Sequence, residues 1–298
     1  MSIAPSHPRR RVGAGIALKL AAVLAMGLMS ALVKLAAERG AHTLEIVFFR
    51  NLFAFIPIVA YVLATRAWIV LRTARPLGHL VRSVVGISGM VCGFAALGMM
   101  PLSDFTAITF AAPLFITALS WPVLGEKVGP HRWAAVAVGF VGVLVMVRPD
   151  PVNLIGLGAL LALGQALGTA GAMLAIRQLG STEPGPTIVF YFTLAATLVG
   201  AAGLPFVWTR PSPELLLILI GCGLLGGVGQ LLLTQAFRLA PAAIVAPFDY
   251  AALLLAGLLG FTLWGEAPSA ATLVGGTIVV ASGLYILWRE TRRRAGPP

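Results

Sequence analysis

Long apolar stretches alternate with short polar connections along almost the whole chain. Breaking the hydropathy at charged residues, prolines and glycines gives ten apolar spans, at residues 13–36, 43–64, 77–99, 102–124, 132–148, 154–178, 185–208, 213–237, 241–263 and 269–288. A helix that crosses a bilayer needs about 20 mainly apolar residues. Because backbone N–H and C=O groups find no water in hydrocarbon, we predict ten transmembrane helices in an all-α polytopic membrane protein.

The composition excludes a water-soluble protein. Only 10% of the 298 residues are charged and 59% are apolar, whereas a soluble globular domain carries about 25% charged residues. So few charges cannot cover a water-facing surface, which rules out a soluble enzyme. The net charge of +11 comes from basic residues at span ends and in the tails rather than from one patch, so we expect no nucleic-acid partner.

Basic residues fall unevenly on the two sides of the predicted bilayer. If both termini are cytoplasmic, fifteen Lys and Arg residues lie inside and four lie outside. The positive-inside rule therefore predicts cytoplasmic termini, which require an even number of spans. We expect a multi-pass protein of the bacterial-type inner membrane, surrounded by the lipid bilayer, as a monomer or weak homodimer.

The two halves of the chain repeat one another. A shift of 140 positions matches several landmarks: Gly86 with Gly226, Pro101 with Pro241, and Gly125-Glu126 with Gly265-Glu266. Residues 1–148 and 149–298 then form two repeats of five spans each. Since five is odd, the second repeat enters the membrane inverted relative to the first. Inverted repeats allow two related conformations, open to opposite sides around a site near the midplane, which is typical of transporters.

A family resemblance rests on three parts of the chain: Arg50-Asn51-Leu52-Phe53-Ala54, Pro101-Leu102-Ser103 through Gly125-Glu126, and Pro241-Ala242-Ala243 through Gly265-Glu266. They resemble the EamA-type branch of the drug/metabolite transporter superfamily over nearly the whole chain. The resemblance implies a ten-helix transporter whose relatives export amino acids, drugs and metabolites or import S-adenosylmethionine or flavins. The stretch around Asp249-Tyr250 is similar to the S-adenosylmethionine carriers, so uptake of that kind is the alternative to export.

Ionisable residues in mid-membrane are the first candidates for contact with a substrate. Each costs at least about 2.5–3.5 kcal/mol, so each is expected to face a partner or a cavity. Lys19, Arg50 and Asp249 meet this description. A buried cation and anion can hold the two ends of a zwitterion or gate the pathway by pairing. The alternative is a structural ion pair, or a Lys19 side chain that extends to the interface.

Uncharged polar residues form stripes with helical spacing on three spans. Thr109 belongs to the stripe of the fourth span, Gln165 to that of the sixth and Gln230 to that of the eighth. We expect the three to converge on one central void, because each glutamine amide needs several hydrogen-bond partners. The alternative is that these stripes only pack helices together. Tyr191 and Tyr250 are further candidates for stacking on a substrate or for hydrogen bonding to it.

The energy for transport must come from the membrane rather than directly from ATP. The sequence has no phosphate-binding Gly-x-x-x-x-Gly-Lys-Ser/Thr loop, and it has no catalytic cluster either. We expect no cofactor and no metal. Asp249, the most deeply placed carboxylate, is the candidate for a coupling proton. We predict a secondary transporter of small polar or amphipathic metabolites, such as amino acids, with export favoured. A flippase for lipid-linked substrates is a further alternative. An intramembrane enzyme, the third class, would need catalytic groups that the chain lacks.

Overall fold

The computed structural model describes residues 8–65, 72–125, 129–148, 156–180, 182–240 and 242–295. Within these ranges the regular structure consists of α-helices and one 3₁₀ helix. They are, in chain order, α1 (Pro8–Glu38), α2 (Thr43–Thr65), α3 (Pro76–Leu97), α4 (Leu102–Thr109), α5 (Ala112–Leu124), α6 (Pro130–Val147), α7 (Leu157–Leu179), α8 (Gly185–Val207), α9 (Pro213–Leu239), α10 (Ala242–Val245), the 3₁₀ helix η2 (Ala246–Tyr250), α11 (Ala251–Trp264) and α12 (Ala270–Ala295).

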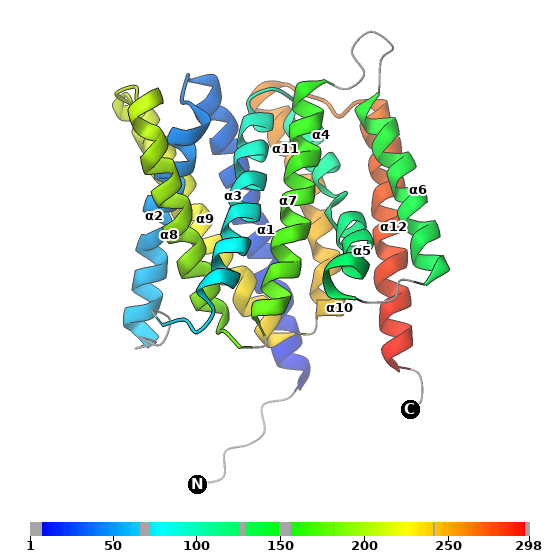
Figure 1. The fold of residues 1–298 in the computed structure, drawn as a ribbon. Coiled ribbons are helices and arrows are strands. Elements are labelled where there is room, and N and C mark those ends of the chain that lie inside the picture. The colour runs from blue at the N-terminus through cyan, green and yellow to red at the C-terminus, as the bar shows by residue number, and fades with distance from the viewer. Residues whose placement is uncertain are drawn as a thin grey trace.

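Ten segments of the described chain are long and apolar enough to cross a bilayer, which confirms the ten predicted spans. Two of these segments join more than one helix: α4 with α5, and η2 with α11. Large apolar side chains stand on the outer surface, among them Phe206 at 86% and Leu254 at 79% exposure. A belt of such side chains is suited to lipid and not to water. The start of α1 and the end of α12 lie on the same side of the molecule, as an even number of crossings requires (Figure 1).

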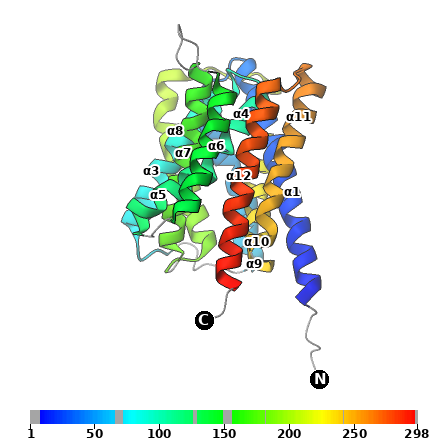
Figure 2. The same ribbon diagram turned by 90° about the vertical axis from the view of Figure 1, so that its right-hand side faces the viewer.

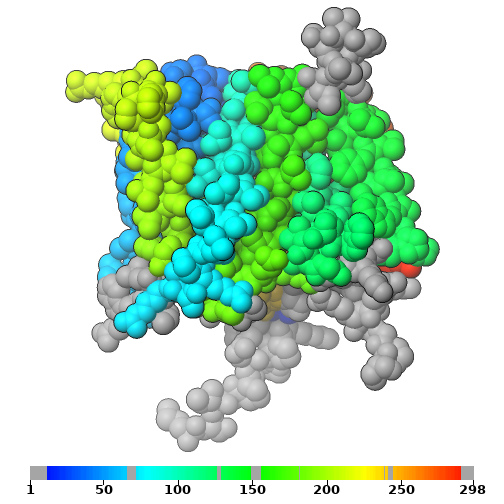
Figure 3. Space-filling model, viewed as in Figure 1, coloured from blue at the N-terminus to red at the C-terminus, as the bar shows by residue number. Residues whose placement is uncertain are grey.

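Glycine contacts bring helices from the two halves of the chain together. α3 lies beside α7 and α6 beside α12 in both ribbon views (Figures 1 and 2). α8, α3, α7 and α6 follow one another across the face seen in Figure 3. A Cβ built on Gly168 of α7 would lie 2.5 Å from the Cα atom of Gly89 in α3. Such backbone contact needs the smallest residue on both helices, as is common where membrane helices pack closely.

Gly168→Ala should therefore destabilise the protein. The added methyl group meets the backbone of Gly89, which cannot swing aside as a flexible side chain would. We expect a loss of about 1–3 kcal/mol, typical of overpacking, measured as a lower unfolding temperature of the purified full-length protein. Gly13→Ala is the matched control, because nothing lies within 4 Å of a Cβ at that position. Equal unfolding temperatures for the two variants would contradict the close packing of α3 on α7.

The fourth and ninth spans are not the continuous helices that the sequence predicted. The fourth is interrupted between Thr109 and Ala112, and the ninth contains η2 between α10 and α11. Pro113 removes the N–H that would bond to the carbonyl of Thr109 in a regular helix. The chain tightens instead, and the Ala111 N–H donates to the Ile108 carbonyl three residues back at 2.9 Å. Whether a proline interrupts a helix depends on how the surrounding residues pack. Hydropathy alone therefore did not reveal the interruption.

The two interrupted spans correspond under the shift of 140 positions. Phe110-Ala111, which separate α4 from α5, fall on Tyr250-Ala251, where η2 passes into α11. Both spans end at a glycine in the left-handed region, with φ of 67° at Gly125 and 68° at Gly265. Such a helix end favours glycine because it has no Cβ. This agreement fits the repeat proposed from the sequence, while the inversion of the second copy stays a prediction.

Candidate functional site

A cavity of about 590 Å³ lies among helices from both halves of the chain. Its walls come from α1, α4, α5, α7, α9, η2, α11 and α12. Most lining side chains are apolar, and the polar ones supply hydroxyls, one amide and one carboxylate: Ser30, Thr106, Thr109, Thr117, Gln165, Thr169, Asp249 and Tyr250. Sites for small molecules commonly occupy about 300–1,000 Å³, so the cavity is large enough for a metabolite.

The two helix breaks meet at this cavity. The rings of Phe110 and Tyr250 stack with their centroids 5.0 Å apart and their planes inclined by 30°. Each residue stands at the break of its span, and the two are equivalent under the shift of 140 positions. The Tyr250 hydroxyl also lies against Gly283 of α12, where a Cβ would collide with it. Discontinuous helices near mid-membrane are where many transporters place their substrate sites.

A short ion pair joins α1 to the wall of the cavity. Lys19 Nζ lies 2.6 Å from Asp249 Oδ1. The Lys19 side chain is 1% exposed, whereas that of Asp249 is 46% exposed and lines the cavity. Lys19 Nζ also lies 4.9 Å from the centroid of the Phe237 ring. The lysine is therefore held behind the wall, and the carboxylate faces the cavity with room for a second cationic partner.

Arg50 lies apart from this pair. Its side chain is buried on α2, and one guanidinium N–H donates to Asn51 Oδ1 at 2.9 Å. Arg50 does not line the cavity. Of the pairings that the sequence left open for Asp249, the structure forms the one with Lys19 and not the one with Arg50. A zwitterion in this cavity would thus reach Asp249 without reaching Arg50.

The three polar stripes converge only in part. Thr109 and Gln165 line the cavity, and Gln230 does not. At the level of Gln230 the neighbouring Gly229 faces Met26 of α1, so α1 lies across α9 there. α9 reaches the cavity one turn later, at Leu233. The expectation that all three residues share one void was therefore wrong for Gln230.

Gln165 and Tyr191 differ in their surroundings. The Gln165 side chain reaches back to α3, where a Cβ on Gly93 would collide with its Oε1 atom. That Oε1 atom has no hydrogen-bond partner among the described residues. Tyr191 lies outside the cavity on α8, with its ring centroid 4.8 Å from that of His79. Gln165 thus lines the cavity while its Oε1 atom is buried against α3, whereas Tyr191 contacts another helix.

A second lysine–carboxylate pair contacts the cavity wall at Leu102, on the side that lies away from the termini. Lys34 Nζ lies 2.6 Å from Glu266 Oε1 and donates to the Met100 carbonyl at 3.0 Å. The other carboxylate oxygen of Glu266 accepts from the N–H of Leu102, the first residue of α4, at 3.2 Å. A carboxylate is favoured at that helix end by the helix dipole. We call Lys34, Glu266 and Leu102 the far latch.

The far latch corrects one expectation. The sequence suggested that Glu126 and Glu266 bond to the short turns that follow them. Glu266 instead binds α1 and α4, far away in the chain. Glu126 lies outside the described residues. Sequence reasoning also missed Phe110, although the shift of 140 positions that matched Pro101 with Pro241 places it on Tyr250.

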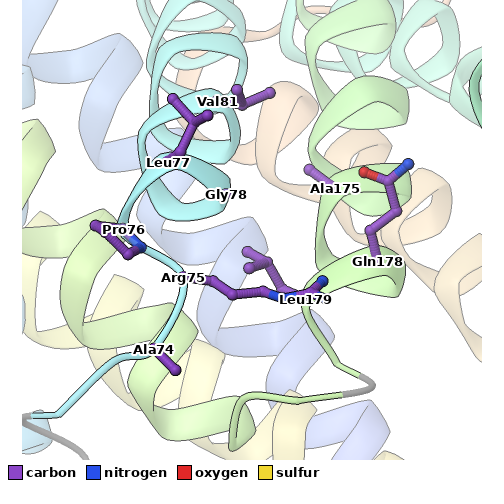
Figure 4. Close-up of a pocket in the computed structure, with 9 residues that line it drawn as sticks. All are labelled: Ala74, Arg75, Pro76, Leu77, Gly78, Val81, Ala175, Gln178 and Leu179. Atoms are coloured by element: carbon purple, nitrogen blue, oxygen red, sulfur yellow. The ribbon is translucent and has the colours of Figure 1, made fainter.

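A second pocket, of about 440 Å³, lies between the start of α3 and the end of α7 (Figure 4). Arg75, its one charged lining residue, is exposed. Nearby, Glu183 accepts hydrogen bonds of 2.9 Å from Thr73 Oγ1 and from the Ala74 N–H. Burial raises the pKa of Glu183, but these bonds and His79 lower it below its usual range. The stability that these interactions give the folded protein is fully present above the ordinary pKa of a glutamate. It is lost as the pH falls through the lowered pKa of Glu183. This region is structural.

Comparison with known proteins places the chain in a family. The model of the EamA-like transporter family matches it twice, at residues 13–148 and 156–288. The pseudopaline exporter CntI of Pseudomonas aeruginosa (strain UCBPP-PA14) is 32% identical over 90% of this chain and 94% of its own length. A riboflavin transporter of Rhizobium johnstonii is 34% identical over 76% of this chain and 75% of its own length.

Proteins of lower sequence identity are also similar to this chain. An S-adenosylmethionine uptake transporter of Rickettsia prowazekii is 26% identical over 84% of this chain and 85% of its own length. One crystal structure superposes on 96% of this chain and 99% of its own with a TM-score of 0.62 at 21% identity, which shows a common fold. These relatives are transporters of small molecules, and none of them is named as an enzyme. The chain belongs to the EamA-like transporter family.

Proposed function

We propose that this protein is a secondary transporter that carries a small polar or amphipathic metabolite through the cavity by alternating access. The observation that carries the proposal is the ion pair between the buried Lys19 and Asp249, whose carboxylate lines a cavity of about 590 Å³. A carboxylate in an otherwise apolar wall attracts a solute with an amino or other cationic group, because that group replaces Lys19 as its partner. Thr109, Gln165 and Tyr250 supply hydroxyl and amide groups to the same solute.

Both termini are proposed to be cytoplasmic and the two repeats, residues 1–148 and 149–298, to be inverted. Fifteen basic residues against four support this orientation. The stacking of the equivalent residues Phe110 and Tyr250 supports a pseudo-two-fold axis through the cavity. In this orientation the far latch is on the outer side.

The gating proposal uses the two lysines of α1. Lys19 and Lys34 are fifteen residues apart, or about 22 Å along the helix. Each binds a carboxylate near one end of the ninth span, Asp249 and Glu266. With the far latch closed, the cavity is separated from the outer side. Release of the latch opens that side, and Asp249 takes the coupling proton when Lys19 leaves it.

Export of an amino acid or a related compound is the favoured direction, and uptake of an S-adenosylmethionine-type solute is the alternative. Relatives named as an exporter and as uptake carriers support both directions. The lipid-linked alternative would require a solute much larger than the cavity, so we do not pursue it.

Transport by the purified protein in proteoliposomes tests this function. The panel comprises labelled amino acids, S-adenosylmethionine, riboflavin and pseudopaline, each with and without an imposed pH gradient. We expect saturable flux of one solute class, with a rate that changes with the gradient. Asp249→Asn serves as the control for leakage, because it keeps the shape of the side chain while losing the charge that faces the cavity. Equal flux in empty and protein-containing liposomes for every solute, under both conditions, would contradict the proposal.

A further inference from the structure

Two arginines are buried in the membrane region away from the cavity. Arg50 on α2 is 4% exposed and Arg82 on α3 is 8% exposed. Neither arginine forms an ion pair with a carboxylate among the described residues. By contrast, Lys19 and Lys34 of α1 each form one. Charged groups in hydrocarbon are expected to face a partner. These two positive charges therefore lack the compensation that Lys19 and Lys34 receive.

The hydrogen-bonding capacity of both guanidinium groups is largely unused. Arg50 donates to Asn51 Oδ1, while its Nε has no partner among the described residues. Arg82 stacks on the Phe192 ring with its Cζ atom 3.6 Å from the centroid. Its Nε and one terminal nitrogen have no partner in the same ranges. A neutral ring face attracts a cation but accepts none of its N–H groups in the guanidinium plane. These free donors need an acceptor that the described residues do not supply.

The two arginines belong to one region. The Asn51 side chain, which holds Arg50, also donates to Met90 Sδ of α3 at 3.4 Å. Met90 packs against the cluster of Ile87, Phe192 and Ala196, and Phe192 is the ring that carries Arg82. The two positive charges repel each other. An anion between them would turn that repulsion into two attractive contacts.

Glycines allow both guanidinium groups to lie directly against a helix backbone. A Cβ on Gly226 of α9 would lie 2.8 Å from Arg50 Nε, and one on Gly86 would lie 2.7 Å from a terminal nitrogen of Arg82. The shift of 140 positions matches these two glycines with each other. Any larger residue would press on the charged group. The two glycines are thus equivalent in the repeat, although Arg82 stands on the helix of its glycine and Arg50 comes from a neighbouring helix.

The carboxylates described so far are bonded to partners other than these two arginines. Glu183 accepts from Thr73 and Ala74 and lies 3.7 Å from His79, and it forms no ion pair with Arg82. Lys19 and Lys34 likewise occupy Asp249 and Glu266. Glu45 on α2 is likewise bonded to Thr209, and no ion pair joins a carboxylate of the described residues to Arg50 or Arg82.

We propose that Arg50 and Arg82 together bind a small anion, with the chemistry of chloride or of a carboxylate group. Guanidinium groups form strong charge-assisted hydrogen bonds to such anions. The anion comes either from solution as a free ion or from a carboxylate-bearing solute. This site is separate from Asp249 and goes beyond the proposed transport function, so its test uses binding and needs no flux.

The experiment follows thermal unfolding of the purified full-length protein at constant ionic strength. Isethionate, a sulfonate that is neither a halide nor a carboxylate, is replaced stepwise by chloride in one arm and by acetate in another. We expect a saturable rise of about 5 °C in unfolding temperature, because a ligand that binds the folded state stabilises it. A rise in the chloride arm assigns a free ion, and a rise in the acetate arm alone assigns a carboxylate group.

Variants show whether the arginines are responsible. Arg50→Gln and Arg82→Gln should each abolish the rise, while Arg75→Gln, which changes an exposed arginine directly before α3, should keep it. If a Gln variant does not fold, Arg82→Lys retains the charge and should weaken the rise by removing the fork of donors. No saturable rise of the wild-type protein in either arm would overturn the proposal. So would a full rise in the Arg50→Gln or Arg82→Gln variant.

Discussion

Asp249→Asn is expected to lower the transport rate at least about tenfold while the protein still folds. The substitution keeps the shape of the side chain but removes the charge that faces the cavity and compensates Lys19 at 2.6 Å. Losing 1.4 kcal/mol of interaction with a solute already lowers affinity tenfold, and a buried cation left without its partner costs more. Flux of the identified solute into proteoliposomes measures the change.

A double variant separates the two roles of this carboxylate. Lys19→Met combined with Asp249→Asn removes both charges, so it should regain the unfolding temperature that Asp249→Asn alone loses. If Asp249 binds the solute, the double variant still transports slowly. Wild-type rate and pH dependence in Asp249→Asn would leave Asp249 with a structural role only.

Glu266→Gln is expected to open the cavity at the far latch. The substitution removes the nearer carboxylate of the buried Lys34, leaving Glu38 at 3.9 Å, and weakens the acceptor for the Leu102 N–H. A buried cation that loses its nearest anion is destabilised by more than about 1.4 kcal/mol, which moves the equilibrium toward the open side more than tenfold. A cysteine at Thr106, next to the latch in the cavity wall, should then react faster with an impermeant thiol reagent applied from outside.

The matched control for the far latch is Glu214→Gln. Glu214 pairs with Arg39 at 3.0 Å, but their side chains are 78% and 40% exposed. Exposed pairs contribute about 0–1 kcal/mol, so this variant should leave the labelling rate unchanged. Equal rates for Glu214→Gln and Glu266→Gln would show that the Lys34–Glu266 pair does not govern access.

The number and order of the spans could be predicted because hydropathy depends on local composition. The same holds for the ends of the fourth and ninth spans, where Gly125 and Gly265 adopt the left-handed conformation. The helix breaks could not be predicted in this way. Pro113 stands in the second position of α5, where proline is well tolerated, and an apolar sequence around it looks like one continuous helix.

The site was predictable only as a set of residue types. Burial costs identified Lys19 and Asp249 as needing partners, but their contact joins residues 230 positions apart, so periodicity could not pair them. Gln230 shares its helix face with Leu233 and Phe237, yet α1 covers α9 at its level. From the sequence, Arg82 was only one of the basic residues near span ends. Its contact with the Phe192 ring could not be predicted, because that contact depends on how α3 packs against α8.

We expect a water-accessible route for a solute to run through the cavity beside Asp249. Thiol labelling tests it most directly, in protein whose free cysteines, Cys92 and Cys222, are replaced by alanine. Cysteine at Thr109 should react with a water-soluble reagent, and the identified solute should slow that reaction. Cysteine at Leu254, which is 79% exposed on the lipid-facing surface, should stay unreactive. Labelling at Leu254 but not at Thr109, or labelling at Thr109 that saturating solute does not slow, would contradict the account.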